Sequence, residues 1–204
     1  MELTVIFGVC ILIMSVVIHE LAHGYTAVFF GDPTPRLQGR LTLNPLKHLE
    51  WFGSVIVPIT TGMLGVAFGW AKPVQFNPYN LSNRRWGEFW IALAGPASNL
   101  LIAAIFGIII RILLVSGHLP VHFIQISAYV VTVNVFLAIF NLMPLPPLDG
   151  SKILFNIIPQ RYNWVRDWME RYSIAFGLIA IFLIWRFVEP VIPYIFSFFT
   201  GVSI

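Results

Sequence analysis

The sequence has few charged residues and a single cysteine. Only 10% of its 204 residues are charged and 58% are hydrophobic, whereas a soluble domain carries about 25% charged residues. This composition excludes an ordinary soluble domain and predicts a membrane protein. Cys10 stands alone, which excludes an intrachain disulfide framework and a cysteine-rich zinc site.

The sequence also lacks linkers, low-complexity tracts and fixed-period repeats, which predicts a single domain over residues 1–204. Its first segment begins MELTV, without a basic region or a small-residue cleavage pattern, so we expect it to remain as an anchor. The basic residues are dispersed rather than clustered with aromatics. The net charge of +3 therefore predicts no nucleic-acid partner.

Long apolar runs predict an all-α polytopic membrane protein with about four to six transmembrane helices. Each run is long enough to cross a hydrocarbon core of about 30 Å as a helix. The expected spans are residues 3–30, 89–110 and 122–143, with a fourth that opens at 172–185. Whether residues 190–204 cross again is left open.

The segment over residues 52–78 is ambiguous, because it is apolar but rich in glycine and ends in AKPVQFNPYN, a pattern typical of extended chain. If it enters the membrane and returns, the loops at 31–87 and 150–171 share one side and carry most of the basic residues. If it spans, those residues divide more evenly. The positive-inside tendency favours a re-entrant, partly extended segment, with both loops in the cytoplasm.

The stretch HELAH ends the first apolar run. His19 and His23 lie four residues apart, so a helix places both imidazoles on one face with Glu20 beside them. This H-E-x-x-H pattern offers zinc two nitrogen ligands and provides a carboxylate that can accept a proton from water. The alternative is a set of side chains that are only hydrogen-bonded at the membrane surface. Three ionisable groups in an apolar helix favour the metal.

A catalytic zinc usually has three protein ligands, so a third is needed. Asp32 follows the motif too closely to fold back, and Asp167 belongs to a predicted surface helix. Asp149 follows the third span in proline-rich, broken backbone, which membranes tolerate only against protein or a wet cavity. A re-entrant segment at 52–70 puts the exits of the first and third spans on one face, whereas a spanning segment separates them. The metal and the charges therefore select the same topology.

Four blocks of the sequence resemble the site-2 protease family of intramembrane zinc metalloproteases. They cover the chain from its first span to about residue 155, and their order and spacing are highly specific. The blocks are HELAH at 19–23, GWAKPV at 69–74, AGPASN at 94–99 and NLMPLPPLDG at 141–150.

The resemblance implies one zinc ion per chain, held by His19, His23 and Asp149, with Glu20 as the catalytic base. It also implies two further residues on the substrate side of the site. Asn141 would help to hold the substrate main chain, and Asn99 would support the site, although an asparagine in a membrane helix often serves only as an interhelical hydrogen-bond partner.

The resemblance further implies an intramembrane endopeptidase that cleaves transmembrane segments of membrane proteins. We expect a catalytic core over about residues 1–155 and C-terminal helices over 156–204, without a PDZ or CBS domain. The expected setting is the lipid bilayer of a prokaryotic plasma membrane, with the site open to the cytoplasm. The oligomeric state is not predicted.

Two rival functions are compatible with inward-facing histidines and an aspartate. A membrane zinc transporter, or a metal-binding protein without peptidase activity, explains the ligands but gives no reason for Glu20 beside them. A catalytically silent scaffold of the same family is the other rival. The intact Glu20 argues against it.

Overall fold

The structure, a computed structural model, describes residues 2–50, 56, 60, 72–117 and 120–202. Three of its helices are long and apolar enough to cross a membrane: α1 (Glu2–Phe29), α4 (Arg84–Val115) and α5 (Val121–Leu142). The residues that the structure describes form helices and irregular chain with no strand. These features confirm the predicted all-α class of integral membrane protein.

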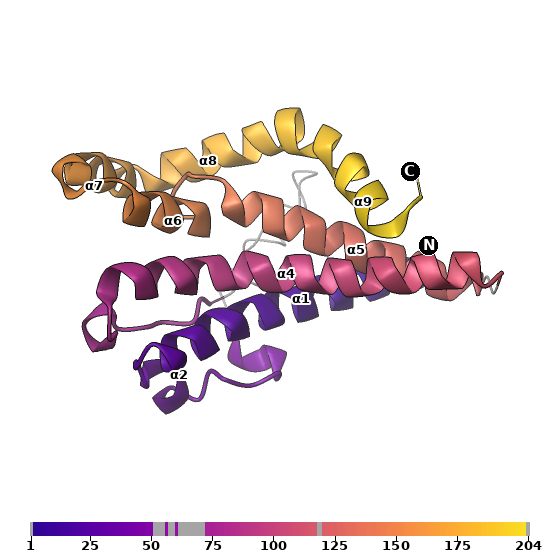
Figure 1. The fold of residues 1–204 in the computed structure, drawn as a ribbon, viewed down its shortest axis with the longest axis horizontal. Helices are drawn as coiled ribbons and strands as arrows, with labels where there is room; N and C mark the ends of the chain where they lie inside the picture. The colour runs from indigo at the N-terminus through magenta and orange to yellow at the C-terminus, as the bar shows by residue number, and fades with distance from the viewer. Residues whose placement is uncertain (1, 51–55, 57–59, 61–71, 118–119, 203–204) are drawn as a thin grey trace.

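The three long helices pack side by side, with α4 in contact with both others (Figure 1). Helices α1 and α5 run in the same direction and α4 runs in the opposite one (Figure 1). Their C-terminal ends therefore lie at the same end of the bundle. This arrangement agrees with the topology in which the first and third spans leave the membrane on one face.

The connection from α1 to α4 starts and finishes at this same end. The backbone N–H of Ser82 donates a hydrogen bond to the Phe30 carbonyl over 2.8 Å, just after α1 ends and just before α4 begins. Residues 72–77 are extended chain that pairs with no strand among the described residues. Of the predicted re-entrant segment, residues 52–71 except 56 and 60 lie outside the described residues, but the two ends of the connection lie where re-entry requires them.

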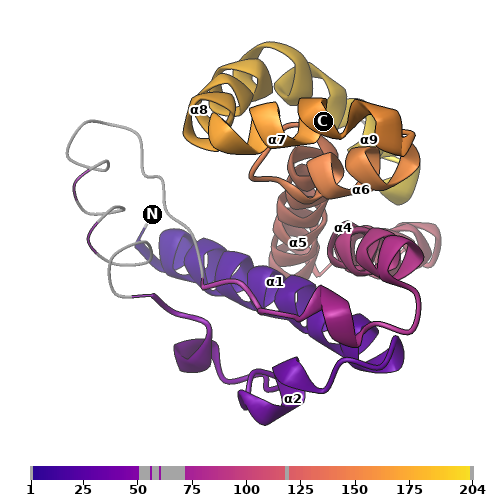
Figure 2. The same ribbon diagram turned by 90° about the vertical axis from the view of Figure 1, so that its left-hand side faces the viewer.

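The shorter helices gather mainly around this end. Seen end-on, α2 lies on the side of α1, whereas α6 and α7 lie on the opposite side of the bundle, with α6 packed mainly against α4 (Figure 2). The bounds are α2 (Thr34–Leu37), α6 (Asp149–Ile157) and α7 (Asn163–Arg171), with 3₁₀ turns at Pro45–Lys47, Pro78–Asn80 and Gln160–Tyr162. Helix α7 covers the predicted amphipathic surface segment, and Arg166 on it pairs with the buried Glu88 of α4 over 4.0 Å.

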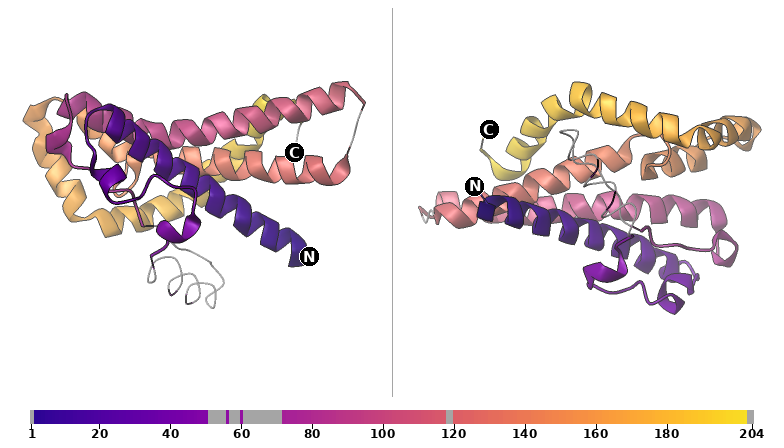
Figure 3. Two further views of the ribbon diagram at one scale, coloured as in Figure 1. Left: turned by 90° about the horizontal axis from the view of Figure 1, so that it is seen from below. Right: turned by 180° about the vertical axis from the view of Figure 1, so that it is seen from behind.

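The predicted fourth span is a helix in pieces. It runs through α8 (Ser173–Leu183), a π-helical turn (Ile184–Val188), a 3₁₀ turn (Glu189–Val191) and α9 (Ile192–Thr200), and arches over the three long helices (Figure 3). No piece alone has the length of a span. Helix α9 closes the apolar core at the far end, where Phe196 packs with Ile110 and Val131 and the Arg111 side chain donates to the Phe198 carbonyl.

Asp32 fastens the two ends of the α1–α4 connection together. Its buried carboxylate accepts hydrogen bonds from the backbone N–H and hydroxyl of Thr34, from the backbone N–H of Asn77 and from the Asn80 amide, over 2.5–3.1 Å. Burial raises the pKa of this carboxyl, but the four hydrogen bonds outweigh burial, and the pKa lies below its ordinary value of 3.8.

We therefore expect Asp32→Asn to destabilise the protein by about 1–3 kcal/mol at neutral pH, because an amide turns a donor toward buried donors. The lowered pKa of Asp32 stabilises the folded protein at pH values above 3.8, the ordinary pKa of the group. This stabilisation is lost as the pH falls from there through the lowered pKa. The gap in melting temperature should therefore shrink below about pH 4. Thermal unfolding in detergent, with the exposed Asp167→Asn as control, measures it; a gap that is constant down to acid pH would contradict the assignment.

Candidate metal centre

Two histidines near the C-terminal end of α1 form the centre of the site. His19 and His23 are buried, and their Nε2 atoms lie 3.0 Å apart, as the four-residue spacing on a helix predicts. The Nδ1 of His23 lies 2.6 Å from the Ile91 carbonyl of α4. A carbonyl oxygen can only accept, so Nδ1 carries the proton and Nε2 keeps its lone pair.

Asp149, the first residue of α6, completes the cluster from the other end of the sequence. Its Oδ2 lies 3.1 Å from the Nε2 of His19 and 3.2 Å from the Nε2 of His23. The proline-rich turn after α5 makes this possible, because a regular helix cannot continue through it. The three predicted ligand residues therefore meet, and Lys152 Nζ lies 3.5 Å from the other Asp149 oxygen.

The donor atoms of this cluster fit a metal ion. The Nε2 of His23 bears a lone pair, and the carboxylate oxygen can only accept. The His19 Nδ1 lies 2.6 Å from the Asn99 side-chain oxygen, which likewise leaves its Nε2 with a lone pair. Three lone pairs thus face one another at 3.0–3.2 Å. Ligand atoms about 2.1 Å from a tetrahedral zinc lie about 3.4 Å from one another, which is close to these separations.

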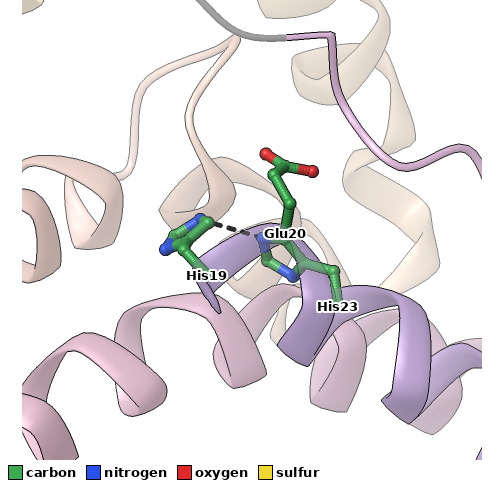
Figure 4. A group of neighbouring side chains, drawn as sticks. All are labelled: His19, Glu20 and His23. Atoms are coloured by element: carbon green, nitrogen blue, oxygen red, sulfur yellow. Dashed lines mark hydrogen bonds between the residues drawn. The ribbon is translucent and has the colours of Figure 1, made fainter. Parts of the chain in front are cut away.

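Glu20 lies beside the cluster but points elsewhere. One of its oxygens and the histidine nitrogens lie within 4.8 Å of one another, so Glu20 could also serve as a third ligand. Figure 4, however, shows its carboxylate turned away from the imidazoles. Its Oε2 accepts a hydrogen bond of 2.7 Å from the backbone N–H of Val74, in the extended segment. Asp149, which contacts both imidazoles, is the better placed of the two acids.

Helix α4 approaches the histidines through a glycine. A Cβ atom placed on Gly95 would lie 2.5 Å from the Nε2 atoms of both His19 and His23, closer than such contacts occur. Sequence reasoning marked AGPASN as a block but missed this role. The available signal was a glycine inside an apolar helix, four residues before Asn99, which is typical of a close approach.

The two predicted asparagines have different surroundings. Asn99 is fully buried on α4, with its oxygen at His19 and its nitrogen 2.8 Å from the Asn134 side-chain oxygen. Asn141 is partly buried at the end of α5, and its nitrogen donates to the Leu137 carbonyl over 2.9 Å. Among the described residues, no hydrogen bond joins Asn141 to the histidines or Asp149.

Sequence reasoning missed Ser15 and Asn134, which continue the hydrogen bonds beyond Asn99. The Asn134 nitrogen donates to the Ser15 hydroxyl oxygen over 2.9 Å. The only signal in the sequence was that each is a polar residue inside an apolar span, a pattern typical of interhelical hydrogen bonds. Nothing in the sequence shows that they meet each other or Asn99.

A membrane bundle that carries an H-E-x-x-H cluster with two buried histidines is typical of membrane-embedded metallopeptidases, and comparison with known proteins supplies the family. The model of peptidase family M50 matches residues 7–119 and 111–184. The chain belongs to this family, the site-2 protease family that its motifs resemble.

Named relatives cover most of the chain. It is 37% identical to "Putative zinc metalloprotease YwhC" of Bacillus subtilis (strain 168), over 90% of this chain and 81% of that protein. It is 32% identical to "Putative zinc metalloprotease Rip2" of Mycolicibacterium smegmatis, over 68% of this chain, and spans only about half of that relative, 52%. It is 26% identical to "Zinc metalloprotease MJ0392" of Methanocaldococcus jannaschii, over 85% of this chain and 41% of that protein. No solved structure matches the chain.

The close approach of α4 gives a test of the site. Gly95→Ala should displace one or both imidazoles and lower the affinity for Zn²⁺ or Co²⁺ by at least about tenfold, as loss of a partner that orients a ligand does. Competition with a chromophoric chelator measures this affinity. Gly8→Ala on the same helix as the histidines is the control, because its Cβ would meet nothing within 4 Å. Equal affinities in both variants would show that α4 does not fix the imidazoles.

Proposed function

We propose that the protein is a zinc-dependent intramembrane endopeptidase that hydrolyses peptide bonds in transmembrane segments of other membrane proteins. One observation carries the proposal: the Nε2 atoms of His19 and His23 and the Oδ2 of Asp149 converge within 3.2 Å inside a membrane bundle, with Glu20 beside them. The zinc metalloprotease names of the relatives support the same metal and the same reaction.

Each residue of the site has a distinct role in this proposal. His19, His23 and Asp149 hold one zinc ion, which when bound lowers the pKa of water to about 7 and polarises a carbonyl. Glu20 accepts the proton of the attacking water and delivers it to the nitrogen of the leaving amine. The Val74 N–H holds the Glu20 carboxylate away from the ligands, so that it stays available as a base.

The substrate must unwind before it is cut, because a membrane helix uses its carbonyls in its own hydrogen bonds. The extended segment 72–77 reaches Glu20 through Val74 and is the natural place for an unwound substrate to lie, by strand addition. Asn141 is our candidate to hold the substrate main chain. Asn99 is fully buried with both ends of its amide engaged, which favours support of His19 over contact with substrate.

The position of the site within the bundle supports a cytoplasmic opening. His23 and Asp149 lie at the end where the loops with most basic residues emerge, and such loops face the cytoplasm of prokaryotic membranes. In this proposal the protein resides in a prokaryotic plasma membrane and water reaches the site from the cytoplasm.

The transporter rival has less support. The part of the chain that the structure describes holds one group of metal-ligating side chains, His19, Glu20 and His23, which Asp149 joins by contact. A transport path needs a succession of binding sites. Transport by itself also gives no reason for a carboxylate that a backbone N–H holds next to the proposed ligands.

The first test separates an enzyme from a metal-binding protein. Glu20→Gln preserves the size of the side chain but removes the base, so cleavage of a single-span substrate should fall by about 10²–10⁴. Zinc should stay at one ion per chain, because Glu20 is not a ligand in this proposal. Metal analysis and a cleavage assay on the same preparation give both values.

The outcomes of this test are distinct. Near-normal cleavage with zinc retained would disprove the role of Glu20 as base. Loss of zinc from a folded protein would instead make Glu20 a ligand. Retained zinc with lost cleavage is the expected result, and a transporter would keep most of its flux.

The second test concerns the third ligand. Asp149→Ala should weaken zinc binding by more than the roughly 10–100-fold that loss of a hydrogen-bond partner of a ligand costs. The control is Asp167→Ala, which removes an exposed carboxylate from α7. Full zinc retention in Asp149→Ala would exclude Asp149 and leave Glu20 as the remaining acid within reach.

A further inference from the structure

We propose that Asn134, on α5, is a positioning residue that fixes which nitrogen of His19 faces the metal. It does not touch the ligands and acts through the amide of Asn99. The inference rests on the proposed zinc site and extends it to a side chain that the motifs do not include. Its basis is a buried row of hydrogen bonds. The polarity of the row, meaning which group donates and which accepts in each bond, can be derived from one end.

The row begins at a backbone carbonyl. The side-chain nitrogen of Asn134 lies 2.9 Å from the Val130 carbonyl, one turn earlier on α5. Because a carbonyl oxygen only accepts, the atom that faces it must be the donating end of the amide. The oxygen of Asn134 therefore points the other way, toward Asn99.

This orientation determines the next two groups. Asn99 lies 2.8 Å from the Asn134 oxygen and must present its nitrogen there, which turns its own oxygen toward His19. The Asn99 oxygen lies 2.6 Å from the His19 Nδ1, so Nδ1 must carry the proton that joins them. The Nε2 of His19 is then left with its lone pair toward His23 and Asp149.

Burial prevents the direction of these hydrogen bonds from being reversed. Asn99 and Asn134 are both 0% exposed, so no bulk water can replace a mismatched partner. Reversal of the Asn99 amide would set its oxygen against the oxygen of Asn134, an unsatisfied contact that is costly in an apolar interior. The Ser15 carbonyl, 3.5 Å from the Asn99 nitrogen, is at the limit of a hydrogen bond and gives weak support to the same orientation.

His23 does not depend on this row. Its Nδ1 donates directly to the Ile91 carbonyl, so its tautomer is fixed by backbone alone. Loss of the Asn134 amide should therefore disturb His19 and leave His23 unchanged. A general loosening of the bundle would disturb both histidines.

The first measurement is zinc affinity by chelator competition. Asn134→Leu keeps the branched shape of the side chain but removes its hydrogen bonds, and should weaken zinc binding by about tenfold, the lower range for loss of a partner that orients a ligand. Asn134→Asp in its neutral form keeps a carbonyl acceptor and an O–H donor, and should stay within about threefold of the native protein. Ser127→Ala is the control, because this buried hydroxyl on the same helix has no partner among the described residues.

The second measurement needs no metal. In metal-free protein with ¹⁵N-labelled histidine, at a pH where the ¹⁵N signals themselves show neutral rings, NMR distinguishes the protonated ring nitrogen from the other. The native protein should show Nδ1 protonated in both His19 and His23, and Asn134→Leu should lose this preference at His19 only. The His19 signals are assigned by comparison with His19→Ala.

Several outcomes would overturn the inference. They are native zinc affinity in Asn134→Leu, an equal loss in Ser127→Ala, or a native His19 protonated at Nε2. If Asn134→Leu does not fold, the tautomer of His19 in the native protein and the zinc affinity of Asn134→Asp still test the inference. If the native protein binds no zinc, the proposed function fails, and the tautomer measurement still tests the role of Asn134 by itself.

Discussion

One oxygen of Asp149 contacts both imidazoles of α1, and this contact limits how the three long helices can be arranged. It requires the ends of α1 and α5 to lie at the same face, and so requires the long connection before α4 to return to the face that it left. It also requires α5 to stop abruptly, which the proline-rich turn ensures. Asp32 secures the connection by tying the exit of α1 to residues 77 and 80.

The membrane imposes a second constraint, because polar groups among apolar helices must find protein partners. Both imidazoles meet it through α4: His23 uses the Ile91 carbonyl and His19 uses Asn99. Gly95 lets the α4 backbone come close enough to serve both. The two proposed histidine ligands are thus held by a helix that contributes no proposed ligand itself. Their Nδ1 atoms are occupied, which leaves each Nε2 free for the metal in the proposed site.

The separation of Glu20 from the ligands bears on what the site does. A carboxylate one residue from a ligand could bind the metal directly, yet it is turned to the backbone of Val74, in an extended segment. The proposed base and the proposed place for an unwound substrate are therefore joined by one hydrogen bond. This link gives a physical reason for an extended segment beside a helical bundle, which a site built only to bind metal would not need.

Features that depend on the local order of residues could be predicted from the sequence. The apolar runs predicted the long helices, the four-residue spacing predicted one face for His19 and His23, and the distribution of charge selected the topology that allows Asp149 to reach them. The broken helix over 173–200 and the surroundings of Asn99 were not predictable, nor were the roles of Gly95, Val74 and Asn134. Each of these depends on a neighbour from another helix or a distant segment. The distance between two helices and the partner of a buried amide are set by packing in three dimensions, and this packing leaves no periodic signal in the sequence of either helix.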